Sequence, residues 1–166
     1  MRLDPCTYRR VHLLPDPGSF NEAAAFLSSS LLLSHSIRRD TLAIVVLKRG
    51  VIAAPGDHVR QLRPDLESST GWLRAVLRGK WKGLGAVMME HPFNVGAWCG
   101  RVIQTFMGVA GVVGEIMVDQ PLLIVHTNNG VELGSTAEIR APCPPPCRAA
   151  ISNIILDRAE AGLPPV

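Results

Sequence analysis

The amino-acid sequence predicts an α/β domain with a largely parallel sheet flanked by helices. Strand-like and helix-like segments alternate along the 166 residues, which is typical of this class. The run Thr41–Leu47 (TLAIVVL) is uninterrupted and rich in β-branched residues, as in strands that are buried on both faces. Apolar residues make up 47% of the chain and charged residues 19%, a globular composition that fits one domain over residues 1–166.

A capping box marks the first helix. Ser19 follows a proline- and glycine-rich turn and can serve as the N-cap, and Glu22 stands three residues later. The segments expected in the first half are a strand at Tyr8–Leu14, this helix to about Ser34, a strand at Thr41–Leu47, a short return strand at Val51–Ala53, and an amphipathic helix at Gly71–Arg78 with helix-start signals from Pro64.

The second half begins with a basic, glycine-rich linker, Gly79–Gly85. The segments expected after it are strands at Ala86–Glu90, Val102–Met107, Leu122–Val125 and Ala137–Arg140, a short helix at Pro92–Cys99, a turn or hairpin at Gly108–Gly114, and a last helix at Arg148–Glu160. There is no internal repeat.

Hydropathy indicates no membrane-spanning helix, because no run of 18 uncharged apolar residues occurs. We interpret the apolar stretch Ala23–Leu33 as a buried helix of a cytoplasmic protein rather than as a signal peptide, since acidic residues precede it.

The four cysteines do not indicate a disulfide-dense protein. In Cys143-Pro-Pro-Pro-Cys147, an extended polyproline conformation at about 3.1 Å per residue would set the two Cα atoms ~12 Å apart. That is beyond the limit of about 7 Å for a disulfide, although a turn or a cis-proline could close the gap. No zinc site or other metal site is expected, because no second cysteine pair or paired histidine accompanies these two.

Charge is divided unevenly between the two halves of the chain. Residues 1–82 hold 13 Lys and Arg against 7 Asp and Glu, whereas residues 83–166 hold 4 against 7. A basic half suggests a surface that meets a polyanion. A solvated surface without a partner is the alternative, and charge alone leaves both open.

Several segments resemble a known family in the same order along the chain. The first is Leu33-Ser34-His35-Ser36-Ile37-Arg38-Arg39-Asp40, which is similar to an "FLSHxIRxD" stretch, and the second is residues 60–68, which are similar to an "lxPDExs" element. The third is residues 121–131, which match a proline–strand–"GDHxG" segment in length, and the fourth is Leu156-Asp157-Arg158, which is similar to a closing "LDR". These segments resemble the archaeal tRNA pseudouridine N1-methyltransferases of the SPOUT superfamily. Two segments depart from the family: His126-Thr127-Asn128 stands where it has Gly-Asp-His, and residues 139–147 replace its cofactor loop.

The resemblance implies a trefoil-knotted fold with the knot at the carboxyl terminus, a homodimer, and S-adenosylmethionine bound by three loops. Transferred to this sequence, the cofactor-binding residues would be Leu122, Val125, His126, Thr127, Asn128, Gly130, Ala141, Pro142, Cys143, Cys147 and Ile151. The first of these loops follows the carboxyl end of a strand, where open α/β sheets place ligands. An ordinary turn at Gly130 and a rigid surface loop at Pro142–Pro146 are the alternatives.

Methylation of pseudouridine N1 requires alignment of donor and acceptor at about 3–3.5 Å. The N1 proton must leave, so a base would help. The candidates are His126, Cys147 and Asp157, which the sequence does not rank, and a histidine that follows a buried strand, as His126 does, is more often structural than catalytic.

The basic half supplies candidate contacts to tRNA phosphates. They are Arg38, Arg39, Arg60, Arg63, Arg74, Arg78, Lys80 and Lys82. Trp72 and Trp81 lie among them and could stack on a base, but Trp72 is also well placed for the core.

Three functions remain open at this point. The first is an S-adenosylmethionine-dependent methyltransferase acting on a tRNA T-loop pseudouridine at position 54. The second is a knotted RNA-binding protein that has lost methyl transfer, and the third is a related enzyme that modifies ribosomal RNA.

Overall fold

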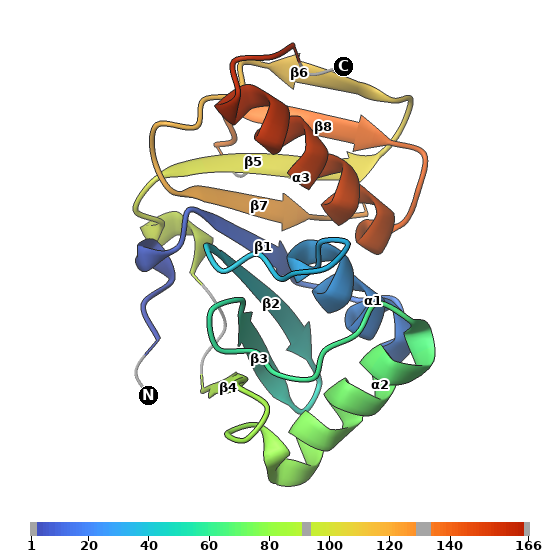
Figure 1. The fold of residues 1–166 in the computed structure, drawn as a ribbon. Helices are drawn as coiled ribbons and strands as arrows, with labels where there is room; N and C mark the ends of the chain where they lie inside the picture. Colours follow the sequence, from blue (N-terminus) through green and yellow to red (C-terminus); the bar gives the residue numbers. More distant parts are fainter. Residues whose placement is uncertain (1–2, 91–93, 129–133, 165–166) are drawn as a thin grey trace.

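The computed structural model describes residues 3–90, 94–128 and 134–164, and within these ranges the strands form one eight-stranded sheet (Figure 1). The strands are β1 (Arg10–Leu14), β2 (Thr41–Leu47), β3 (Gly50–Pro55), β4 (Val87–Met89), β5 (Arg101–Met107), β6 (Gly111–Gly114), β7 (Leu122–His126) and β8 (Ala137–Ala141). Their spatial order is β4-β3-β2-β1-β7-β5-β8-β6.

The central strands β2, β1, β7, β5 and β8 are all parallel to one another, whereas β3, β4 and β6 are antiparallel to their neighbours. The predicted α/β class and the largely parallel sheet are therefore confirmed. The knot stays a prediction. Because the five central strands point the same way, their carboxyl ends meet at one edge of the sheet, which we call the carboxyl edge.

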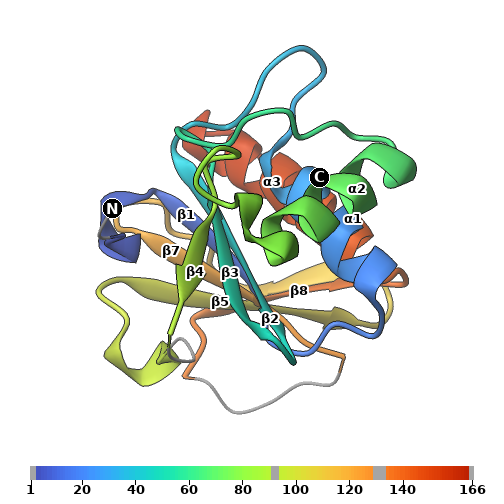
Figure 2. The ribbon, with the colours of Figure 1, turned by 90° about the horizontal axis from the view of Figure 1, so that it is seen from below.

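The helices are α1 (Phe20–Leu31), α2 (Leu66–Ala75) and α3 (Pro145–Glu160), with short helical turns at Pro5–Thr7, Val76–Lys80 and Val95–Ala97. Figure 2 shows α1, α2 and α3 on the same face of the sheet. α1 and α2 cover β2 and β3 through a core that includes Phe26, Leu31 and Ile52, and α3 covers β5, β7 and β8 through Ile155 and Leu156.

The opposite face of the sheet also carries a buried apolar cluster. Val11, Leu42 and Leu123 lie there, and Val95 and Trp98 pack against them. Every residue of β1 and β7 is consequently buried, as expected for central strands with both faces covered.

The capping box is confirmed, because the Ser19 hydroxyl accepts a hydrogen bond of 3.0 Å from the Glu22 amide. The Glu22 carboxylate reaches back to the amide of Gly18, one residue before the N-cap. Of the expected helix at Pro92–Cys99, the described residues form only the short turn at Val95–Ala97, and residues 91–93 lie outside the described ranges.

Of the turn or hairpin expected at Gly108–Gly114, residues 108–110 form a bend and Gly111–Gly114 forms a strand, which does not pair with β5 as a hairpin would. β6 pairs with β8, and β5 pairs with the other side of β8, so the last strand of the chain lies between two earlier ones. Long-range pairing of this kind leaves no local pattern in the sequence.

The extended conformation expected for residues 143–147 is wrong. Pro144 is the N-cap of α3, and Pro145 begins the helix, a position where proline is well tolerated because its missing N–H would be unpaired anyway. The helical turn brings the Cα atoms of Cys143 and Cys147 to 5.8 Å, and the two residues form a disulfide.

A second disulfide, Cys6–Cys99, joins residues 93 apart with a Cα–Cα distance of 6.2 Å. It links the segment before β1 to the segment before β5. Sequence spacing cannot predict such a pairing.

Candidate functional site

A cavity of about 510 Å³ opens between α3, β6 and the segment that follows β8. Its lining is Ala110, Gly111, Val112, Arg140, Ala141, Pro142, Ile151 and Ile155. Three predicted cofactor residues, Ala141, Pro142 and Ile151, are among them. The volume and the mainly apolar lining are typical of small-molecule sites, and the cavity lies at the carboxyl edge of the sheet.

Beside this cavity, Arg148 connects β5 with the segments that follow β7 and β8. Its side chain is fully buried, and its Nε donates a hydrogen bond of 3.2 Å to the Thr105 hydroxyl in β5. Nη1 donates to the Cys143 carbonyl at 2.8 Å, and Nη2 donates to the Thr127 carbonyl at 2.7 Å. The predicted loops after β7 and β8 are therefore held together by one guanidinium group.

Sequence reasoning missed the role of Arg148 and treated it only as the start of the last helix. The available signal was a single arginine directly after Cys147, at the beginning of a helix with apolar neighbours. Burial lowers the pKa of Arg148 because a charge is costly to desolvate, and the nearby Glu22 carboxylate counteracts this effect.

From Thr105 a chain of hydrogen bonds continues across the sheet between buried side chains. The Thr105 hydroxyl lies 2.6 Å from Nδ1 of His126, and Nε2 of His126 lies 2.9 Å from Nδ1 of His12. Nε2 of His12 then lies 2.9 Å from Oδ1 of Asn153 in α3. The chain thus joins β5, β7, β1 and α3.

The direction of each bond follows from the Asn153 amide, whose nitrogen donates to the Ser30 carbonyl at 2.9 Å. The Asn153 oxygen must accept, so His12 carries its proton on Nε2 and accepts at Nδ1. His126 therefore donates from Nε2 and accepts from the Thr105 hydroxyl. Thr105 in turn accepts from Arg148.

The imidazoles of His12 and His126 in this series of hydrogen bonds are both neutral. Burial is the main cause: it lowers the pKa of His12 to about 3 and the pKa of His126 well below its ordinary value. Positive charge from Arg10 and Arg38 near His12, and from Arg148 near His126, acts in the same direction. His126 has no unused ring nitrogen in this arrangement.

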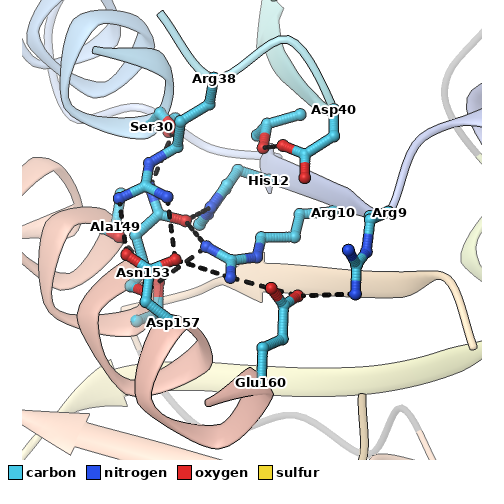
Figure 3. A network of polar contacts seen from close by, with 12 residues as sticks. Arg9, Arg10, His12, Ser30, Arg38, Asp40, Ala149, Asn153, Asp157 and Glu160 are labelled. Carbon is cyan, nitrogen blue, oxygen red and sulfur yellow. Dashed lines mark hydrogen bonds and ion pairs between the residues drawn. The ribbon is translucent and has the colours of Figure 1, made fainter. Parts of the chain in front are cut away.

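Asp157 lies in a different cluster, at the amino end of β1 (Figure 3). Its carboxylate accepts two hydrogen bonds of 3.0 Å from Arg38 and pairs with Arg10 at 2.8 Å. Glu160 pairs with Arg9 and Arg10, each at 3.3 Å. The structure does not bring Asp157 together with the cavity.

The other predicted cofactor residues are distributed as follows. Leu122 begins β7 and is buried under α3, and the Val125 side chain faces the opposite side of the sheet. Thr127 is half-buried beside Arg148, Asn128 is exposed, and Gly130 lies outside the described residues. Cys147 is exposed and bonded to Cys143, one helical turn before Ile151 on the same face of α3.

Most predicted RNA contacts lie on the surface, but one is committed elsewhere. Arg39, Arg60, Arg63, Arg74, Arg78, Lys80 and Lys82 are exposed. The Arg38 side chain is only 14% exposed and forms an ion pair with Asp157.

Trp72 is a core residue whose indole nitrogen donates to the Arg60 carbonyl at 2.8 Å. Trp81 is half-buried, with the Lys82 ammonium 5.2 Å from its ring centroid.

Within residues 3–90, 94–128 and 134–164, no three His, Cys, Asp or Glu side chains are grouped so as to hold a metal ion. None of the helices in these ranges combines the length and apolarity needed to cross a membrane.

Comparison with known proteins agrees with the resemblance noted from the motifs. No protein-family model matches the chain. A protein of Natronomonas pharaonis named tRNA (pseudouridine(54)-N(1))-methyltransferase is 27% identical over 128 residues, which cover 75% of this chain and 61% of the relative. The chain thus spans about three fifths of the relative's length. This distant similarity to a tRNA-modifying methyltransferase supports the family suggested by the motifs.

Proposed function

We propose that this chain is an S-adenosylmethionine-dependent RNA methyltransferase that modifies N1 of a pseudouridine in the T-loop of tRNA, the reaction in the name of its relative. The cavity beside α3 carries the proposal, because Ala141, Pro142 and Ile151 line it. A trefoil knot and a homodimer, both implied by the family resemblance, are parts of the same proposal.

The cavity fits the proposed cofactor in size and chemistry. Val112, Ile151 and Ile155 offer apolar contacts suited to a purine ring. Arg140 is the charged residue of the lining; one of its nitrogens pairs with Glu138 at 3.0 Å, and its other N–H groups can pair with the carboxylate of the methionine part. When bound there, S-adenosylmethionine would supply an electrophilic methyl group, and the protein would align it and exclude water.

Removal of the N1 proton is the remaining chemical requirement. Both ring nitrogens of His126 are used within the buried chain of hydrogen bonds, and Asp157 lies near the amino end of β1, whereas the cavity lies at the carboxyl edge of the sheet. Of the three candidates, Cys147 is the one that shares a face of α3 with Ile151 of the cavity lining, one turn before it. We therefore propose Cys147 as the base in the form of the protein in which its bond to Cys143 is reduced.

Calorimetry with S-adenosylmethionine tests the binding site. Ile151→Trp should fill the cavity and weaken binding at least tenfold, whereas Ile154→Trp on the exposed side of the same helix should leave it unchanged. Absence of binding to the unaltered protein at millimolar cofactor would remove the enzyme proposal.

Transfer of a labelled methyl group tests the substrate. We expect incorporation into tRNA that contains pseudouridine at position 54 and none into the same tRNA with uridine there. Incorporation into ribosomal RNA instead would favour the related ribosomal enzyme. Activity that depends on a reductant and is lost in Cys147→Ser would support Cys147 as the base.

One observation favours a second function, RNA binding without methyl transfer. The Arg148 guanidinium occupies the space between the Thr127 and Cys143 carbonyls, where the resemblance places the cofactor loops. In that case the protein would bind tRNA with a steep dependence on salt but show no affinity for S-adenosylmethionine.

The proposed homodimer would use an exposed apolar surface near the cavity. Met107, Val109 and Val113 on and between β5 and β6 are exposed by 55%, 89% and 48%, respectively. Light scattering after size-exclusion chromatography should give twice the 17.9 kDa chain mass, and Val109→Glu should shift the protein toward the monomer.

A further inference from the structure

We propose that a second cavity at the carboxyl edge of the sheet binds backbone phosphates of the RNA, an inference that rests on the proposed function. The cavity has a volume of about 760 Å³. Its lining consists of residues 16–20, residues 46–49, Arg74, Leu77 and Arg78. It therefore lies where β1 and β2 end and is closed on one side by α2.

Positive charge dominates this second cavity. Lys48 and Arg49 come from the turn after β2, Arg74 and Arg78 come from α2 and the turn that follows it, and Asp16 is the acidic residue of the lining. Among the described residues, none of these four basic side chains forms an ion pair. Ion pairs are formed by arginines elsewhere in the structure, namely Arg9, Arg10, Arg38, Arg101 and Arg140.

The local backbone presents two of these charges side by side. Arg74 and Arg78 are four residues apart and share a helix face. The helix continues past Ala75 into a turn at Val76–Lys80, in which Gly79 has a φ of 102° and breaks the helical conformation just after Arg78. The Arg74 guanidinium lies 5.8 Å from the ring centroid of Phe20, which orients it at the cavity wall.

The two cavities lie along one edge of the same sheet. The order β2-β1-β7-β5-β8 places four strand spacings between the end of β2 and the end of β8. At about 4.8 Å per spacing, the strand ends beside the two cavities are ~19 Å apart. The cavity beside α3 that is lined by Ala141, Pro142 and Ile151 is called the α3 cavity. An RNA strand with its target base at the α3 cavity can therefore bring phosphates that are a few nucleotides away to Lys48, Arg49, Arg74 and Arg78.

Phosphates are the ligands that suit this arrangement. Arginine forks pair with phosphate oxygens, and a cluster of unpaired cations gains most from a polyanion through release of counterions. The contacts would set the position of the RNA rather than read its sequence.

The test compares two charge-removing pairs, Arg74→Gln/Arg78→Gln and Lys48→Gln/Arg49→Gln, with the unaltered protein in tRNA binding across salt concentrations. Loss of two phosphate contacts should reduce the slope of log K against log salt by about 1.4 for a single strand. For variants that bind equally at 1 M salt, this slope corresponds to a loss of about 25-fold in affinity at 0.1 M salt. Arg74→Lys/Arg78→Lys keeps the charge and should retain most of the slope.

Arg9→Gln/Arg101→Gln is the matched control, because these two arginines lie at the amino ends of β1 and β5 and already pair with carboxylates. This control should bind tRNA like the unaltered protein. Thermal unfolding checks that each variant is folded. Affinity for S-adenosylmethionine should be unchanged in all of them, because the two cavities share no lining residue.

The outcomes separate this inference from the proposed function. If the unaltered protein binds tRNA but both charge-removing pairs bind with the same slope, the phosphate site is overturned and the proposed function stands. If the unaltered protein binds no tRNA, both are overturned. Binding of inorganic phosphate that both charge-removing pairs abolish, together with an unchanged salt slope for tRNA, would assign the cavity to free phosphate instead of RNA.

Discussion

Nε2 of His126 lies 2.9 Å from Nδ1 of His12, and the two buried rings belong to neighbouring parallel strands. Because Asn153 fixes the proton of His12 on Nε2, this contact has one direction, from His126 to His12. The pair requires both rings to be neutral. A proton added to either ring would place a charge in the core and a second donor where an acceptor is needed.

Stability should therefore fall in mild acid. Both histidines have a folded-state pKa below the ordinary value of 6.5, to about 3 for His12, so the unfolded chain binds more protons below that value. The stabilisation is complete above pH 6.5 and is lost as the pH falls toward the folded-state pKa. Between about pH 6 and 4, each histidine should contribute up to about 1.4 kcal/mol per pH unit. Denaturant unfolding at a series of pH values measures this slope.

His126→Gln should reduce that slope by about half, because an amide can still donate to His12 and accept from Thr105 but does not titrate. His35→Gln is the control, since His35 is exposed. An unchanged slope in His126→Gln would contradict the neutral pair.

Replacement of Arg148 by lysine should loosen the segments beside the α3 cavity. One ammonium group cannot reach the Thr105 hydroxyl and the carbonyls of Thr127 and Cys143 together, so at least one buried acceptor loses its partner. We expect a loss of about 1–3 kcal/mol in the free energy of unfolding. Arg63→Lys, an exposed residue, should change it by less than about 0.5 kcal/mol. Equal stability of both variants would show that the Arg148 contacts are not needed.

Asp157→Asn should destabilise the protein without removing a group from the cavity. Burial alone would raise the pKa of Asp157, but hydrogen bonds from Arg38 and Arg10 outweigh it and lower the pKa. The substitution removes the charge that both arginines face, and Glu160 still pairs with Arg10. Because the Asp157 side chain is 46% exposed, we expect about 1–2 kcal/mol rather than the cost of a fully buried pair. Loss of methyl transfer at unchanged stability would instead restore Asp157 as a catalytic candidate.

The two disulfides should contribute unequally to stability. The Cys6–Cys99 bond joins residues 93 positions apart and should contribute about 4–5 kcal/mol through the entropy of the unfolded chain, whereas the Cys143–Cys147 bond joins residues 4 positions apart and should contribute about 2 kcal/mol. Unfolding of Cys6→Ser/Cys99→Ser and Cys143→Ser/Cys147→Ser measures the two values. Mass spectrometry after alkylation without reductant checks the pairing, and alkylated cysteines in the unaltered protein would contradict it.

The sequence by itself was enough for the features that depend on neighbouring residues. The β-branched run Thr41–Leu47 forms β2 with the predicted bounds, and the Ser19–Glu22 pair begins α1, because these signals act over three or four residues. The alternation of strand-like and helix-like segments was also enough to predict the α/β class. In the candidate site, the resemblance named Ala141, Pro142 and Ile151, which line the α3 cavity.

Only the tertiary structure decided which distant residues meet. His12 and His126 are 114 positions apart, β8 enters between β5 and β6, and Arg148 reaches carbonyls on two loops. Such contacts depend on the order of strands in the sheet and on packing of the whole core, which no local pattern encodes. The polyproline run at residues 143–147 shows the same limit: its isolated preference is extended, but the docking of α3 on the sheet makes its last residues helical and brings the two cysteines together.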